Sequence, residues 1–240
     1  MPYIKSVCIA GKTKEVEKYY TRWIQSKGGS RQQRKKETTE RQKKVNDRQT
    51  VKRLTRIINA NFDNKCLYVT FSYTKEQRPD IETLKKHKKE LLKKMRREYR
   101  KENKELKYIE TAEIGERGAV HIHMIVNEIN ACTLSKLWKY GWIAAKPLDD
   151  SGQYRRLAEY FVKYFQKTRG TDEQIQKKAY NCSRNLKRPE PKKTIMKGMR
   201  FKTEIEVPRG WYLDKESVRH GINEEGYEFL FYMLIKEKGS

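Results

Sequence analysis

The sequence predicts an α+β fold, a ferredoxin/RRM-like antiparallel sheet with helices on one face. Residues 67–74, LYVTFSYT, alternate apolar and polar side chains, as a half-buried strand does. Two more strand-like stretches, 107–114 and 119–127, flank the turn residues Gly-Glu-Arg-Gly and predict a hairpin. Helical patterns lie between the strands, and the order β-α-β-β-α-β-α is typical of ferredoxin-like domains.

Each element has its own signal along the chain. Apolar residues at helical spacing predict a helix over about 46–60, and Pro79-Asp80 opens a second helix that runs to about Lys101. After the hairpin we expect, in order, a short helix at 133–139, a strand at 142–148, a helix at 153–167, and strands at 202–207 and 228–236.

Composition divides the chain into three parts. Residues 1–49 are a basic extension, largely helical or partly disordered, in which Gly28-Gly29-Ser30 separates two helical pieces within 12–46. Residues 50–190 contain the whole ferredoxin-like pattern. Residues 191–240 are a C-terminal segment that either completes the core or forms a dimer contact.

The charge of the chain points to a polyanionic partner. Lys and Arg number 56 against 31 Asp and Glu, which gives a net charge of +25. Basic residues concentrate at 31–56, 85–101 and 187–202, and such blocks are typical of phosphate-backbone contacts. Nucleic acid is the first candidate and a membrane surface the second, although any single block is equally well explained as a solvated helix face.

Other classes are excluded or disfavoured. No apolar run approaches the roughly 18 residues of a transmembrane helix, and charged residues follow the short apolar patch at 7–10, so we expect no secretory signal. The four cysteines are widely spaced and form no C-x-x-C pair, which favours reduced thiols over a disulfide framework or a zinc site.

The hairpin carries a candidate metal site. His121 and His123 are two residues apart in a predicted strand, so both imidazoles lie on one face. If the turn centres on Arg117, Glu113 lies opposite His121 with Cβ atoms roughly 5 Å apart, whereas Glu110 faces the other way unless a bulge intervenes. Two imidazoles and one carboxylate leave open positions that suit Mg²⁺ or Mn²⁺ beside a phosphate. The alternative is an exposed histidine pair.

The helix at 153–167 carries a candidate nucleophile. Tyr160, Lys163, Tyr164 and Lys167 share one helix face, while neighbouring apolar residues already supply a packing face. A tyrosine flanked by lysines near a metal ion is a candidate nucleophile, because positive charge activates the phenol. The alternative is that both tyrosines only pack.

Together, three stretches resemble the motifs of the HUH endonucleases: LYVTFSYT, EIGERGAVHIH and YFVKYFQK, in this order. More narrowly, they resemble the rolling-circle replication initiators (Rep) of bacterial phages and plasmids. The tandem Y-x-x-K is similar to that of two-tyrosine initiators of small phages, and SRNL–P, from Ser183 to Pro189, is similar to phage-type Rep proteins. The resemblance covers about residues 50–190.

The resemblance implies a metal-dependent enzyme that nicks and joins single-stranded DNA. His121, His123 and Glu113 would hold Mg²⁺ or Mn²⁺. Tyr160 or Tyr164, with a slight preference for Tyr160, would attack a phosphodiester and leave a 5′-phosphotyrosine and a free 3′-OH. Lys163 and Lys167 would orient or neutralise the phosphate. The implied partners are single-stranded or hairpin origin DNA and a host helicase and polymerase, in the cytoplasm of a bacterial host without membrane association.

Three alternatives remain at this stage. Relaxases and single-strand transposases of the HUH type use the same chemistry. A non-catalytic ferredoxin-like module would bind nucleic acid by stacking bases on sheet aromatics such as Tyr68 and Tyr108. A packaging protein would act through charge alone, but it gives no reason for the histidine pair and the Tyr/Lys face to occur together.

Overall fold

The computed structural model describes residues 3–20, 39–115, 118–171, 174–198, 200–223 and 226–237. The chain divides into two compact units. One unit is Gln49–Lys187, and the other combines Met1–Arg48 with Arg188–Ser240. Each unit contains one five-stranded antiparallel sheet, so the predicted α+β class with antiparallel sheets is confirmed.

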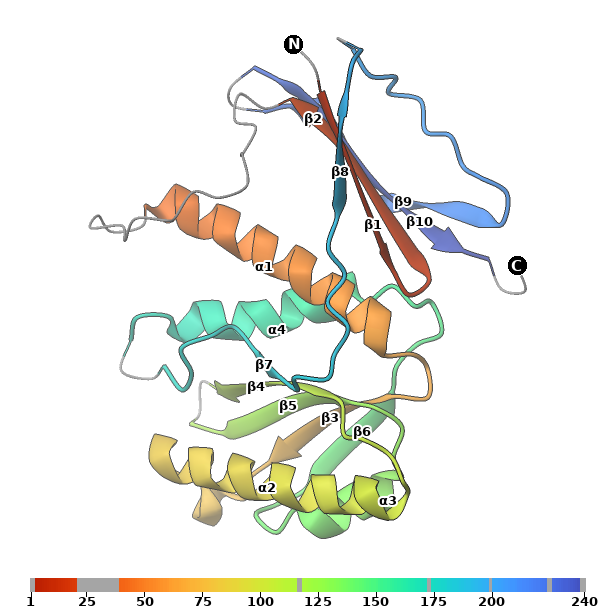
Figure 1. Ribbon diagram of the computed structural model, residues 1–240. Coiled ribbons are helices and arrows are strands. Elements are labelled where there is room, and N and C mark those ends of the chain that lie inside the picture. Colours follow the sequence, from red (N-terminus) through yellow and green to blue (C-terminus); the bar gives the residue numbers. More distant parts are fainter. Residues whose placement is uncertain are drawn as a thin grey trace. The chain divides into compact units, whose positions relative to one another are not determined.

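The unit Gln49–Lys187 has the predicted ferredoxin-like topology. Its sheet has the strand order β6-β3-β5-β4-β7, in which every pair is antiparallel (Figure 1). The elements, in chain order, are the end of α1 (Glu40–Asn61), β3 (Leu67–Ser72), a 3₁₀ turn (Lys75–Gln77), α2 (Ile81–Lys101), β4 (Tyr108–Ile114), β5 (Val120–Val126), α3 (Ala131–Leu137), β6 (Ile143–Pro147), α4 (Arg155–Thr168) and β7 (Asn181–Cys182).

Both faces of this sheet carry helices, which corrects the expectation of helices on one face. Alternate strand residues such as Val69, Ile122 and Met124 pack against α2 and α3 in one core cluster. Ile109 and Ile125 point the other way and pack with α4 and the end of α1 in a second cluster. The expectation failed because apolar spacing shows that α1 and α4 each bury one face, as Leu54 and Ile58 of α1 do, but it does not show which side of the sheet each helix covers.

Helix α2 illustrates why the local sequence forms these elements. The Asp80 side chain accepts a hydrogen bond from the Thr83 N–H at 2.7 Å and so caps the first turn. Leu84, Leu91, Met95 and Tyr99 follow helical spacing and are buried against the sheet. The predicted start at Pro79-Asp80 and end near Lys101 are therefore confirmed.

The second unit corrects the interpretation of both termini. Its sheet, in the order β8-β1-β2-β10-β9, is made of β1 (Tyr3–Ala10), β2 (Thr13–Tyr20), β8 (Lys192–Met196), β9 (Trp211–Ile222) and β10 (Glu228–Lys236). Residues 13–20 are thus a strand, not part of a helical extension. The expected glycine-serine break at 28–30 lies outside the described residues.

The C-terminal segment joins this second sheet and not the core of the ferredoxin-like unit. Strand β10 pairs with β2, and β8 pairs with β1. The predicted strand at 228–236 is confirmed, but 202–207 is irregular. Phe201, directly before this stretch, and Ile205 within it pack onto the sheet's apolar cluster.

Two further observations bear on function. No helix within the described residues is long and apolar enough to cross a membrane. No disulfide joins the four cysteines, all of which lie in described parts of the chain.

Candidate metal and tyrosine site

The β4–β5 hairpin places Glu113 as the sequence predicts. Gly118, at φ +68°, donates its backbone N–H to the Gly115 carbonyl at 2.8 Å and closes the turn. The resulting register pairs Glu113 with His121 and Thr111 with His123. All four residues therefore share the sheet face that α4 covers.

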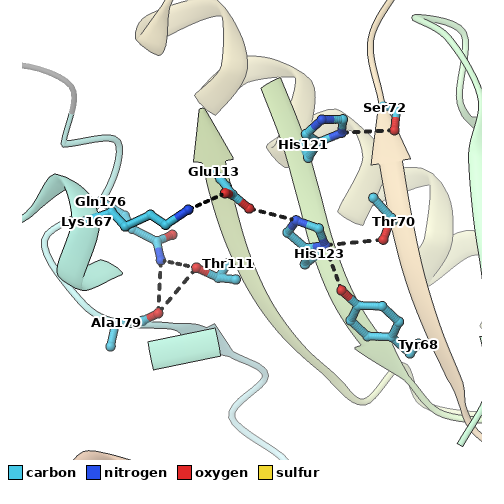
Figure 2. Close-up of polar contacts among 10 residues, drawn as sticks. All are labelled: Tyr68, Thr70, Ser72, Thr111, Glu113, His121, His123, Lys167, Gln176 and Ala179. Atoms are coloured by element: carbon cyan, nitrogen blue, oxygen red, sulfur yellow. Dashed lines mark hydrogen bonds and ion pairs between the residues drawn. The ribbon is translucent and has the colours of Figure 1, made fainter. Parts of the chain in front are cut away.

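His123 is the most enclosed member of this group. Its Nδ1 lies 2.8 Å from the Tyr68 hydroxyl and 3.2 Å from the Thr70 hydroxyl, both on β3 (Figure 2). Its Nε2 is buried, has no hydrogen-bond partner, and lies 3.4 Å from Glu113 Oε2. Burial, with a smaller contribution from the nearby His121, lowers the His123 pKa to about 4, so the imidazole is neutral at physiological pH.

His121 has a different environment on the same strand. Its Nδ1 lies 3.0 Å from the Ser72 hydroxyl, and its ring centroid is 6.1 Å from that of His123. Ser72 is directly paired with His121 across β3 and β5, as Thr70 is with His123. Each histidine thus has a hydroxyl on the neighbouring strand that engages Nδ1 and leaves Nε2 for another partner.

Helix α4 brings both predicted tyrosines to His123. Tyr164 is 8% exposed and stacks on His123, with ring centroids 4.8 Å apart and planes 4° apart. Tyr160 is 41% exposed and meets the rings of His123 and Tyr164 edge-on, at 5.6 Å and 4.3 Å. Phe161, which is fully buried, anchors the helix, so the two tyrosines are not needed to supply its packing face.

The lysines of α4 act on Glu113. Lys167 Nζ lies 3.5 Å from Glu113 Oε1 at the edge of the site (Figure 2). Burial raises the pKa of the Glu113 carboxyl, and the positive charges of Lys167, His121 and Lys163 partly counteract that rise. The structure therefore gathers all seven predicted site residues on α4, β4 and β5 around one carboxylate and one buried imidazole.

The residues fit a divalent cation in their donor chemistry. His123 Nε2 is a buried nitrogen without a hydrogen-bond partner, and it faces a carboxylate. The hydroxyls at Nδ1 can accept a hydrogen bond from that nitrogen, so their position is compatible with the tautomer that carries its proton on Nδ1 and a lone pair on Nε2. Across the described residues, however, no three His, Cys, Asp or Glu side chains are close enough to hold a metal ion: Glu113 approaches His123, while His121 stays with Ser72.

Sequence reasoning missed the residues of β3 that orient the histidines. The alternation at 67–74 puts Thr70 and Ser72 on the polar face of the strand but gives them no role, because the β3–β5 pairing that brings them to the histidines joins elements distant in sequence. Tyr108, proposed as a stacking platform, is instead buried on the α2 face. Glu110 also faces α2, as its parity predicted, and pairs there with Lys88 at 2.7 Å.

The basic block at 85–101 coincides with α2. Lys85, Lys88, Lys94 and Lys101 each pair with a glutamate at 2.7–2.8 Å. A hollow of about 510 Å³ beside the helix is lined by Lys85, Lys88 and residues 174–177. Part of the block's charge is thus neutralised within the protein, and its contact with nucleic acid stays a prediction.

Comparison with known proteins supports the same stretch of chain. Residues 66–169 match the family model described as Replication-associated protein ORF2/G2P. The match covers less than half of the 240 residues, but it runs from the start of β3 to the end of α4 and includes all seven site residues. This stretch is therefore similar to replication-associated proteins of the Rep type. Searches of curated proteins and of solved structures found no match.

Proposed function

We propose that this protein nicks and rejoins single-stranded DNA at a specific site and thereby initiates rolling-circle replication, as an HUH-type endonuclease. The observation that carries the proposal is the contact of Tyr160 and Tyr164 with His123, beside the Glu113 carboxylate. A potential nucleophile and potential metal ligands meet on one face, within a stretch similar to replication-associated proteins.

Tyr160 is proposed as the first nucleophile, because 41% of its side chain is exposed to an incoming phosphate. Its phenolic oxygen would attack the phosphorus, and the bond from phosphorus to the 3′ oxygen would break. The phenol loses its proton, the leaving oxygen gains one as the 3′-OH, and the 5′ phosphate stays on the tyrosine. Tyr164, stacked on His123, would serve the later step that rejoins the strand.

His121, His123 and Glu113 would hold Mg²⁺ or Mn²⁺. When bound, such an ion polarises a phosphate oxygen and stabilises the charge that develops during displacement. Lys163 and Lys167 lie on the α4 face beside the tyrosines, and their positive charge would neutralise the phosphate and lower the cost of forming a phenolate. The implied setting is the cytoplasm of a bacterial host, where a helicase would separate the strands and a polymerase would extend the free 3′-OH.

The test is covalent capture. The protein would be incubated with a randomised single-stranded DNA library, including hairpins, and Mn²⁺, and then run on a denaturing gel. We expect an adduct that EDTA abolishes and that Tyr160→Phe removes or strongly reduces, while the exposed Tyr212→Phe in the other unit leaves it unchanged. An adduct lost only when Tyr160 and Tyr164 are both replaced means that either one attacks. Tight binding that ignores EDTA, with no adduct from any library, favours the non-catalytic binding module.

A further inference from the structure

A row of residues crosses the sheet through the candidate site and ends in an exposed tryptophan. Ser72 pairs with His121 on β5, and Glu113 pairs with His121 from β4. On its other side, the Ser72 backbone N–H donates to the Trp142 carbonyl at 2.9 Å and extends the β3–β6 register by one residue. Trp142, Ser72, His121 and Glu113 thus occupy one row, one residue per strand.

The side chains of this row lie on the same face as the site. Ile143 and Ala145 of β6 pack into the cluster with α2. Because successive side chains alternate, Trp142, Ala144 and Lys146 point to the opposite face, which carries the histidines. All three are exposed, and Trp142 is 60% exposed, so α4 leaves this strip of β6 uncovered.

The backbone of Trp142 is held firmly despite the exposed side chain. A Cβ on Gly141 would meet the Ser72 carbonyl oxygen and lie 2.9 Å from the Thr74 nitrogen, so only glycine permits this close approach. The Trp138 indole also donates to the Ser72 carbonyl at 2.8 Å. Because the backbone is fixed, an indole that stacks on a flat partner loses the freedom of only its own two side-chain torsions on contact.

We propose that Trp142 is a stacking platform for one base of the single-stranded DNA that this protein binds, with Lys146 on the adjacent phosphate and the small Ala144 between them. Two strand spacings, roughly 10 Å, separate the backbones of Trp142 and His121. A base on Trp142 would therefore belong to the same short stretch of DNA as the phosphate at the site. A flat aromatic beside a lysine fits bases and phosphates, and the chain's charge of +25 fits a polyanion. The inference rests on the proposed function for its choice of substrate.

The test measures binding without chemistry. A fluorescently labelled single-stranded oligonucleotide would be titrated in EDTA into a Tyr160→Phe/Tyr164→Phe background that forms no adduct. Trp142→Ala should weaken binding roughly 5- to 150-fold, the range for loss of one stacked base. Trp142→Phe, which keeps a ring, should lose less. Tyr212→Ala, which removes a 46% exposed aromatic in the other unit, should change little.

A second arm asks whether the partner is a base. Oligonucleotides with one abasic position at each site in turn would be titrated into both proteins. The Trp142→Ala penalty should vanish for one abasic position, because the partner of the indole is then already missing. Unchanged DNA affinity in a folded Trp142→Ala protein overturns the inference, as does a penalty that no abasic position relieves. A change in oligomeric state alone, by sedimentation, would assign the strip to a second copy and also overturns it.

The outcomes separate this inference from the proposed function. If the wild type forms the tyrosine adduct and Trp142→Ala binds DNA normally, the function stands and the stacking platform falls. If no adduct forms under any condition but the Trp142 penalty and its abasic relief persist, the platform stands and the nicking function falls.

Discussion

At the scale of single residues, His123 links the candidate site to the stability of the fold. Its pKa of about 4 lies below the ordinary value of 6.5, so the folded state binds this proton less readily than the unfolded state does. The stabilising contribution is fully present above pH 6.5 and is lost as the pH falls towards 4. At pH 5 this loss amounts to about 2 kcal/mol.

The corresponding experiment is urea unfolding in EDTA at pH 7.5 and pH 5. We expect the wild type to lose more free energy of unfolding between these pH values than His123→Gln does, because glutamine has no proton to gain. The comparison is needed because Glu113, whose pKa burial raises, changes stability in the opposite sense. Parallel losses in the two proteins would show that His123 is not held neutral by the fold.

Glu110 and Glu113 form a matched pair three residues apart on β4. Glu113 faces His123, whereas Glu110 is 3% exposed and pairs with Lys88 under α2. Glu113→Gln should weaken Mn²⁺ binding, measured by electron paramagnetic resonance, by at least about 10-fold without unfolding the protein. Glu110→Gln should keep the Mn²⁺ affinity but lower the free energy of unfolding by about 3 kcal/mol, because it leaves the mostly enclosed ammonium of Lys88 without its carboxylate. The reverse pattern would move the metal site to the α2 face.

The site residues also show how far sequence reasoning reaches. Glu113 was placed opposite His121 correctly, because a short hairpin fixes the register of its own two strands. The positions of Ser72 and Trp142 beside the site were not predicted. The pairing of β3 with β5 and β6 joins strands distant in sequence, and its register depends on which face of each strand packs into the core. Local geometry was predictable, and contacts between distant strands were not.

At the scale of elements, the close approach of Gly141 to β3 determines how β6 extends. Gly141→Ala should lower the free energy of unfolding by about 1–3 kcal/mol, because its new methyl group meets backbone atoms of Ser72 and Thr74 that cannot move aside alone. Gly221→Ala in β9, where the nearest atom is 3.6 Å away, should change it by less than about 1 kcal/mol. Urea unfolding of both variants checks this, and equal effects would contradict it.

The strands at the N-terminus show why polar elements are hard to predict. Lys5 pairs with Lys18, and Ile9 with Lys14, so charged residues lie within the sheet and obscure its alternation. The available signal was Gly11, at φ +57°, in the two-residue turn between β1 and β2. As evidence for a hairpin, a glycine-containing turn between two eight-residue stretches is stronger than their polar composition is against it.

At the scale of the whole molecule, the ferredoxin-like unit is an insertion. Strands β1 and β2 precede residue 49, β8 to β10 follow residue 187, and together they form one sheet. Pairing between segments roughly 200 residues apart has no local sequence signal, which explains why the sequence analysis treats the two ends separately. The similarity to replication-associated proteins and all candidate site residues fall within the inserted unit.

The charge of +25 belongs to the whole chain and predicts how DNA binding responds to salt. Each phosphate contacted on a single strand contributes roughly −0.7 to the slope of log affinity against log salt concentration. For about six such contacts, raising the salt from 50 to 200 mM would weaken binding roughly 300-fold. Salt titrations of oligonucleotide binding would measure this slope directly.

Lys146→Gln should make the slope of log affinity against log salt concentration shallower by roughly 0.7, because one phosphate contact is lost. Trp142→Ala should lower affinity at every salt concentration without changing the slope, because stacking releases no counterions. If both variants altered the slope equally, the proposed division of roles, in which Lys146 contacts a phosphate and Trp142 stacks on a base, would be wrong.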